Sequence, residues 1–116
     1  MEKIVTGIGG VFFRSKDNKA LSEWYEKHFG INGVQWEQEA GPTAFAPFKA
    51  NTEKFGSMDQ QFMLNFRVSD LDKLLGGLEA AGVRIDEKTE SDEYGKFASV
   101  YDPEGNKIEL WEPAGN

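Results

Sequence analysis

The pattern of apolar and polar positions in the first half of the chain predicts a strand, a helix and two further strands. Segment 4–14 is apolar and rich in β-branched and aromatic residues, as strands are. A helix follows, with Asp17 or Asn18 as its N-cap and Gly30 as its stop. Its apolar face consists of Leu21, Trp24, Tyr25 and Phe29. Two short strands are expected over 34–39 and 43–49.

The second half of the chain repeats this order. Segment 61–68 predicts a strand, and Asp70 caps a helix that ends at Gly82. The apolar residues of this helix are spaced at i, i+3, i+4 and i+7, namely Leu71, Leu74, Leu75 and Leu78. Gly76 and Gly77 in its middle predict close packing against a neighbour, since glycine otherwise destabilises a helix. Three more strands are expected, over 83–88, 96–101 and 107–112.

Residue matches support an internal duplication. The motif Phe13-Arg14-x-x-Asp17 recurs 53 positions later as Phe66-Arg67-x-x-Asp70. We interpret the two halves as copies of a βαβββ unit, about residues 1–58 and 59–116, within one domain over 1–116. The expected fold class is therefore α+β, with a mixed sheet and its helices on one outer face.

Alternation along the strands assigns side chains to the two faces of the sheet. Val11, Phe13, Leu64 and Phe66 are expected beneath the helices, as are Ile108 and Leu110. The opposite face receives apolar, aromatic and polar side chains that suggest a lined cavity: Gly10, Phe12, Met63, Asn65, Arg67, Glu109 and Trp111. Tyr101, at a strand end, is a further candidate for its lining.

Composition narrows the possible functions. The 116 residues include no Cys and one His, which excludes Cys-ligated metal sites and any site that needs two His from one chain. The net charge of −7 disfavours nucleic acid as a partner. No apolar run approaches the roughly 20 residues of a membrane span, and the first residues lack an apolar signal region, so we expect a soluble cytoplasmic protein.

Several segments resemble the vicinal oxygen chelate superfamily, which includes glyoxalase I, extradiol dioxygenases, and bleomycin- and fosfomycin-resistance proteins. The matching segments are 7–14, 21–30, 65–71, 80–83 and 102–110. The most characteristic match is Asp102-Pro103-Glu104-Gly105-Asn106-Lys107-Ile108-Glu109-Leu110. The resemblance implies two paired βαβββ modules around a U-shaped sheet, commonly in a homodimer. It leaves open whether the modules pair within one chain or across the dimer.

The resemblance also locates the superfamily's metal ligands in this sequence. The first falls on Gly10, which has no side chain, and the one in the second half falls on Met63, a thioether poorly suited to Zn, Ni, Fe or Mg. The glutamate of the last strand is present as Glu109, and segment 43–47 offers no carboxylate or imidazole for the fourth. One ligand is too few for a divalent cation, so we expect no metal and no other cofactor.

These observations favour a metal-free protein that binds a small planar or cationic organic molecule. Glu109 is the candidate catalytic or cation-binding residue, since a desolvated carboxylate serves as a base or attracts a cation. The alternative is a lyase or isomerase of the glyoxalase type that uses Glu109, with or without a metal. A third interpretation is a structural dimer module with a filled cavity. His28, the only imidazole, is expected on the helix side in a structural role.

Overall fold

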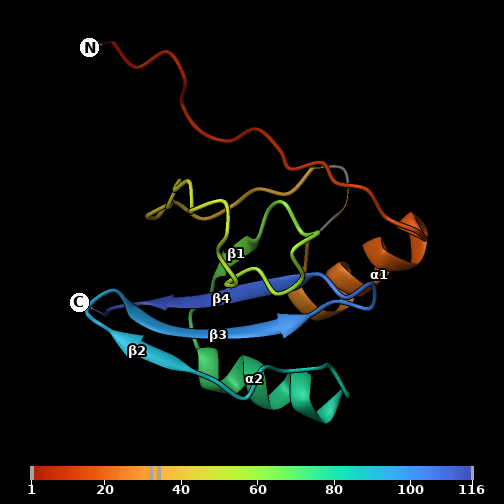
Figure 1. The fold of residues 1–116 in the computed structure, drawn as a ribbon. Helices are drawn as coiled ribbons and strands as arrows, with labels where there is room; N and C mark the ends of the chain where they lie inside the picture. The colour runs from red at the N-terminus through yellow and green to blue at the C-terminus, as the bar shows by residue number, and fades with distance from the viewer. Residues whose placement is uncertain (1, 32, 34, 116) are drawn as a thin grey trace.

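A computed structural model describes residues 2–31, 33 and 35–115. Within these residues the fold consists of two helices and a four-stranded sheet (Figure 1). The helices are α1 (Asn18–Phe29) and α2 (Leu71–Ala80). The strands are β1 (Leu64–Arg67), β2 (Glu90–Asp92), β3 (Gly95–Tyr101) and β4 (Lys107–Pro113). The expected α+β class is confirmed.

The sheet is mixed, with the strand order β1-β4-β3-β2. β1 and β4 run parallel, whereas β3 is antiparallel to both β4 and β2. The parallel pair places Asn65 beside Glu109, and the antiparallel pair places Ser99 on the other side of Glu109. Glu109 therefore lies on an inner strand, between two neighbouring strands.

Both helices begin where the sequence predicts. The Asp17 carboxylate accepts a hydrogen bond from the backbone N–H of Ala20 at 3.1 Å, and Asp70 accepts one from Lys73 at 3.1 Å. α1 ends at Gly30, which adopts the left-handed conformation at φ 69°. These caps satisfy backbone groups that the first and last turns leave without helical partners.

The core lies between the helices and one face of the sheet. The buried apolar residues are Leu21 and Tyr25 of α1, Leu71 and Leu78 of α2, and Ala98, Val100, Ile108 and Leu110 of the sheet. Phe66 of β1 lies against the rings of Tyr25 and Phe29. Alternation thus assigned Phe66, Ile108 and Leu110 correctly, because one face of a half-buried strand is apolar. Val11 and Phe13, also expected beneath the helices, are instead exposed in segment 2–14, which forms no strand.

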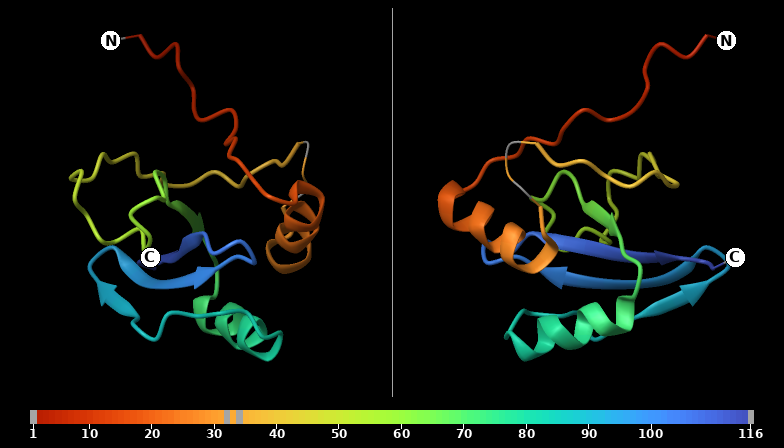
Figure 2. Two further views of the ribbon diagram at one scale, coloured as in Figure 1. Left: turned by 45° about the vertical axis from the view of Figure 1, so that its right-hand side comes forward. Right: turned by 180° about the vertical axis from the view of Figure 1, so that it is seen from behind.

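The connecting segment, residues 35–63 ahead of β1, runs along the opposite side of the sheet from α2 (Figures 1 and 2). The Arg67 guanidinium donates hydrogen bonds to the carbonyls of Glu39 and Pro42, both at 2.9 Å. The Gln60 side chain bonds the backbone of Lys107 at both its N–H and its carbonyl, at 2.9 and 3.0 Å. These contacts fasten the connecting segment to β1 and β4.

The strands expected in the first half do not form in the described residues. Segment 2–14 extends away from the sheet (Figure 2), and Phe12 is 96% exposed. Segments 35–39 and 43–49 also form no strand, while Val34 of the predicted 34–39 lies outside the described residues. An apolar alternating segment can join a sheet, but it forms a strand only where another strand offers its edge.

Two expectations for the second half are also corrected. Of the strand predicted over 83–88, only Ile85 forms a bridge, to Val100, whereas β2 forms further along at Glu90–Asp92. Gly76 and Gly77 do not mark close packing, because a Cβ built at either position meets no atom within 4 Å. Neither described helix is long and apolar enough to cross a membrane.

Candidate functional site

Glu109 is a charged residue in the middle of the buried strand β4. Its neighbours Ile108 and Leu110 are buried against the helices, so its side chain projects from the opposite face of the sheet. The residue is only 8% exposed. A carboxylate at this depth needs hydrogen-bonding or charged partners, because burial without them is costly.

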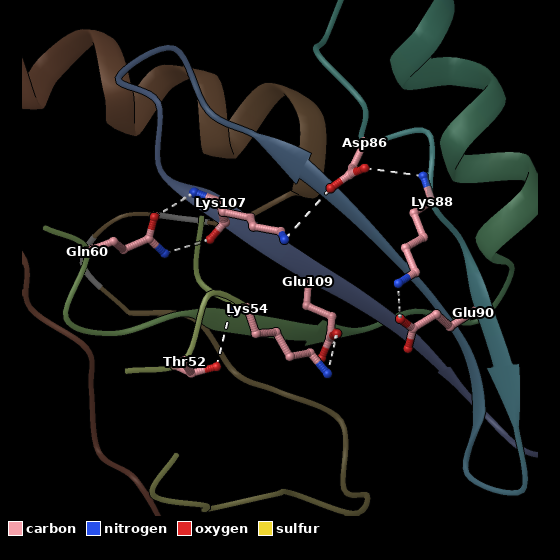
Figure 3. A network of polar contacts seen from close by, with 8 residues as sticks. All are labelled: Thr52, Lys54, Gln60, Asp86, Lys88, Glu90, Lys107 and Glu109. Carbon is pink, nitrogen blue, oxygen red and sulfur yellow. Dashed lines mark hydrogen bonds and ion pairs between the residues drawn. The ribbon is translucent and has the colours of Figure 1, made fainter. Parts of the chain in front are cut away.

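Two partners from different parts of the chain meet the two carboxylate oxygens of Glu109. The Asn65 amide on β1 donates a hydrogen bond to Oε1 at 2.8 Å. The Lys54 ammonium lies 3.6 Å from Oε2 and comes from the connecting segment over this face (Figure 3). The Asn65 contact follows directly from the register of β1 against β4, and the Lys54 contact does not.

Lys54 also lies close to aromatic side chains. Its ammonium is 5.7 Å from the centre of the Phe48 ring, within the range of a cation–π interaction. Phe48 in turn packs against Phe55, with the ring centres 5.4 Å apart. The site therefore combines a carboxylate, an amide, an ammonium and a pair of aromatic rings.

Other predicted site residues make contacts elsewhere. Arg67 holds the carbonyls of the connecting segment, as described above. The ring of Trp111 stacks on that of Phe97, with the ring centres 6.1 Å apart. The Trp111 indole N–H donates a hydrogen bond to the carbonyl of Tyr94 at 2.8 Å. The Tyr101 ring lies beneath the Arg84 guanidinium, at 4.0 Å.

Three further predicted site residues, Met63, Gly10 and Phe12, lie outside the strands of the sheet. Met63 is half-buried just before β1. Gly10 and Phe12 belong to the exposed segment 2–14, which extends away from the sheet (Figure 2). Of the predicted side chains, the structure therefore brings Asn65 into direct contact with Glu109, and it leaves Phe12 in solvent.

The residues at the superfamily's metal positions do not fit a divalent cation. Gly10 offers no side-chain donor, and Met63 offers only a thioether. The ammonium of Lys54 already lies against Oε2 of Glu109. Among the described residues, no three His, Cys, Asp or Glu side chains converge as ligands.

His28 lies on α1, on the helix side of the sheet. Its ring packs against Trp24, with the centres 5.0 Å apart. Burial, together with the neighbouring charge of Lys27, lowers the pKa of His28 below its ordinary value of 6.5. The imidazole is therefore neutral at pH 7, and its packing is that of a structural residue.

The described surface contains hollows away from Glu109. One, of about 200 Å³, lies between α2 and the strands β2 and β3, where Leu75 and Phe97 line it. A second, of about 400 Å³, lies beside the end of α1, where Trp24, His28 and Arg84 contribute to its walls. Glu109 is not among the residues that line either hollow.

Comparison with protein families gives one match, which spans most of the chain. Residues 7–110 match the sequence profile described as "Glyoxalase/Bleomycin resistance protein/Dioxygenase superfamily". A comparison with curated proteins gives no significant match.

Solved structures similar to this chain include an antibiotic binding protein, TnmS3, from Streptomyces sp. CB03234. It is 24% identical, with 84% of this chain and 88% of that chain covered and a TM-score of 0.55. The trypanothione-dependent glyoxalase I of Leishmania major is 20% identical, with coverage of 83% and 78% and a TM-score of 0.53. A protein from the mobile metagenome of V. pseudocholerae is 25% identical, with coverage of 85% and 88% and a TM-score of 0.52.

The sequence analysis missed Lys54 and Gln60 as parts of this face. Both belong to the connecting segment but lie outside its predicted strands, where no helical or strand period assigns side chains to a face. Phe48 lies in the strand predicted over 43–49, which does not form. The nearest signal in the sequence is the aromatic pair Phe48 and Phe55, with Lys49 and Lys54 between them. That spacing alone gives no indication that Lys54 reaches Glu109.

Proposed function

This chain belongs to the Glyoxalase/Bleomycin resistance protein/Dioxygenase superfamily, and we propose that it binds a small organic molecule at the face of the sheet that carries Glu109. The observation that carries this proposal is a carboxylate that is 8% exposed on the sheet face opposite the helices, with aromatic rings nearby. A planar or cationic organic ligand suits such a site, because the carboxylate attracts positive charge and the rings stack on aromatic groups.

The proposal includes loss of the superfamily's metal site. Support comes from the side chains themselves, since Gly10 and Met63 supply no suitable donor and Glu109 is paired with Lys54. We expect purified protein to contain no stoichiometric Zn, Ni, Fe or Mn. Elemental analysis that finds one bound metal per chain, lost on Glu109→Gln, would contradict this part of the proposal.

The test of ligand binding compares Glu109→Gln with Glu79→Gln. Both variants remove one negative charge, but Glu79 is an exposed residue of α2, on the other side of the sheet. We expect Glu109→Gln to weaken binding of cationic aromatic compounds by about 1–3 kcal/mol, the range for a hydrogen bond or ion pair to a desolvated charge. Glu79→Gln is expected to leave affinity unchanged.

Isothermal titration calorimetry with a panel of cationic aromatic compounds and their neutral isosteres measures this effect. Phenethylammonium and phenethyl alcohol form the first pair of probes. Equal affinities of wild type and Glu109→Gln for every cation in the panel would show that this carboxylate does not recognise the ligand.

We further propose that the protein is a homodimer of 13 kDa chains. The exposed apolar side chains of segment 2–14 support this, since a second copy would remove them from water. These side chains are Ile4, Val5, Ile8, Val11, Phe12 and Phe13. Sedimentation that shows only a 13 kDa species at micromolar concentration would contradict it.

Other expectations stay predictions. These are the paired modules over 1–58 and 59–116, the cytoplasmic location and the absence of a nucleic-acid partner. The alternative of a lyase or isomerase that uses Glu109 also stays a prediction. The contacts of Glu109 with the Asn65 amide and the Lys54 ammonium favour a role in binding over a role as a catalytic base.

A further inference from the structure

We propose that Glu109 and Phe48 form a subsite for an organic ammonium group, and that the side chain of Lys54 occupies this subsite until a ligand displaces it. This inference rests on the proposed function and specifies the chemistry of its ligand. It makes Lys54 a residue that determines affinity and specificity for cations.

The position of the Lys54 ammonium defines the subsite. Its nitrogen lies 3.6 Å from Oε2 of Glu109 and 5.7 Å from the centre of the Phe48 ring (Figure 3 shows the carboxylate contact). A carboxylate on one side and the face of an aromatic ring on another are the groups that recognise organic ammonium ions. The protein thus holds an alkylammonium group of its own where an external one would bind.

The carboxylate side of the subsite is built into the sheet. The Glu109 side chain is 11% exposed, and the Asn65 amide holds Oε1 at 2.8 Å, which leaves Oε2 directed to the ammonium. Asn65 and Glu109 are register partners in adjacent parallel strands, so their relative position is fixed by backbone hydrogen bonds. The ring of Phe48 is supported by Phe55 at 5.4 Å.

Lys54, in contrast, is able to leave. Its side chain is 43% exposed and belongs to a connecting segment rather than to a helix or strand. Four rotatable bonds let the ammonium swing into water without movement of the backbone. The backbone N–H of Lys54 is bonded to Thr52 Oγ1 at 3.2 Å, so the turn keeps its shape when the side chain moves.

The nearby charges favour a monovalent organic cation. Lys107, on the same strand as Glu109, is paired with Asp86 at 3.7 Å, and Lys88 is paired with Glu90 at 3.8 Å. These two lysines are paired with other carboxylates, and the cation that pairs with Glu109 in the described structure is the Lys54 ammonium. A single carboxylate oxygen is too few ligands for a divalent metal, and the carboxylate repels anions.

The test measures binding of phenethylammonium and phenethyl alcohol to wild type, Lys54→Met and Lys88→Met. Methionine keeps the length of the side chain and removes its charge. Lys88→Met makes the same change in net charge in an exposed ion pair. We expect Lys54→Met to bind phenethylammonium about 5- to 30-fold more tightly than wild type, since the substitution removes both the ion pair and the cation–π contact of the internal competitor.

Phenethyl alcohol provides the specificity control. Its affinity is expected to change by less than about twofold in Lys54→Met, because a neutral group gains nothing from the released carboxylate. Equal tightening for both probes would overturn the inference, since it would mean that the substitution only opens space. Unchanged affinity for the cation in Lys54→Met would overturn it as well.

Failure of this inference is distinguishable from failure of the proposed function. If Glu109→Gln weakens binding of phenethylammonium but Lys54→Met does not strengthen it, the ligand site stands and Lys54 is not its occupant. If Glu109→Gln has no effect, both are overturned. Thermal unfolding of each variant establishes that it is folded, and Lys54→Gln replaces Lys54→Met if the methionine variant is not.

Discussion

The hydrogen bond between Tyr25 and Asp102 joins the two halves of the chain, and its removal is a direct test of what holds them together. Tyr25 of α1 is 7% exposed, and Asp102, in the turn between β3 and β4, is 4% exposed. The Tyr25 hydroxyl donates to Oδ2 of Asp102 at 2.7 Å. Tyr25→Phe removes this donor and keeps the ring that packs in the core.

The expected loss in the free energy of unfolding depends on the hydrogen-bond donors that Asp102 retains in Tyr25→Phe. Its carboxylate also accepts hydrogen bonds from the backbone N–H groups of Glu104 and Asn106 and from the Asn106 side chain, at 2.9, 3.0 and 2.7 Å. A hydrogen bond to a charged group contributes about 1.5–3 kcal/mol, and three remaining donors favour the lower half of that range. We therefore expect the free energy of unfolding to fall by about 2 kcal/mol, which corresponds to about 8 °C in Tm for a chain of this size.

The effect is expected to be independent of pH near neutrality. Burial, and then the contact with Asp102, raise the pKa of Tyr25 above its ordinary value of 10.0, so the phenol stays protonated and donates its proton. Urea denaturation at pH 6, 7 and 8 measures the difference, and the m-value should not change. Tyr94→Phe is the matched control, because Tyr94 is 65% exposed.

A loss of less than about 0.5 kcal/mol in Tyr25→Phe, equal to that of the Tyr94 control, would refute the reasoning. It would mean that water or a rearranged turn replaces the phenol as donor. The second half would then hold α1 through apolar contacts and the hydrogen bonds of Glu104 to Ser15, Lys16 and Asp17.

Two further predictions concern the Glu104 carboxylate and the glycines. The Glu104 carboxylate accepts hydrogen bonds from the backbone N–H of Lys16, the Ser15 hydroxyl and the backbone N–H of Asp17, and these lower the pKa of Glu104 below its ordinary value of 4.5. The ionised carboxylate therefore stabilises the fold above pH 4.5, and this stabilisation is lost as the pH falls through the lowered pKa. Glu104→Gln should therefore lower Tm at pH 7, and the difference from wild type should shrink as the pH falls below 4.5; a difference that grows as the pH falls below 4.5 would contradict the assignment. Gly95→Ala should destabilise the protein by more than about 2 kcal/mol in urea denaturation, because φ is 131° and a Cβ would collide with the backbone of Glu112 and Pro113. Gly77→Ala in α2, where a Cβ meets open space, should instead stabilise it by about 0.5–1 kcal/mol, and similar losses in the two variants would refute this contrast.

Local features of this chain were predictable from its sequence. Helix caps depend on residues within a few positions, so Asp17 and Gly30 indicated the bounds of α1 correctly. The period of two in a strand likewise assigned Ile108 and Leu110 to the core and Glu109 to the opposite face. The resemblance carried by the segment 102–110 led to the correct superfamily.

The tertiary structure decided what depends on contact between distant segments. Segment 4–14 has the composition of a strand, but in the described chain its backbone pairs with neither edge strand of the sheet, β1 or β2, whereas residues 90–92 pair with β3. Lys54 reaches Glu109 across 55 positions because residues outside any predicted or observed strand carry it over the sheet. A side chain's own spacing predicts which face it occupies, whereas the partner it meets there is set by how the rest of the chain closes around it.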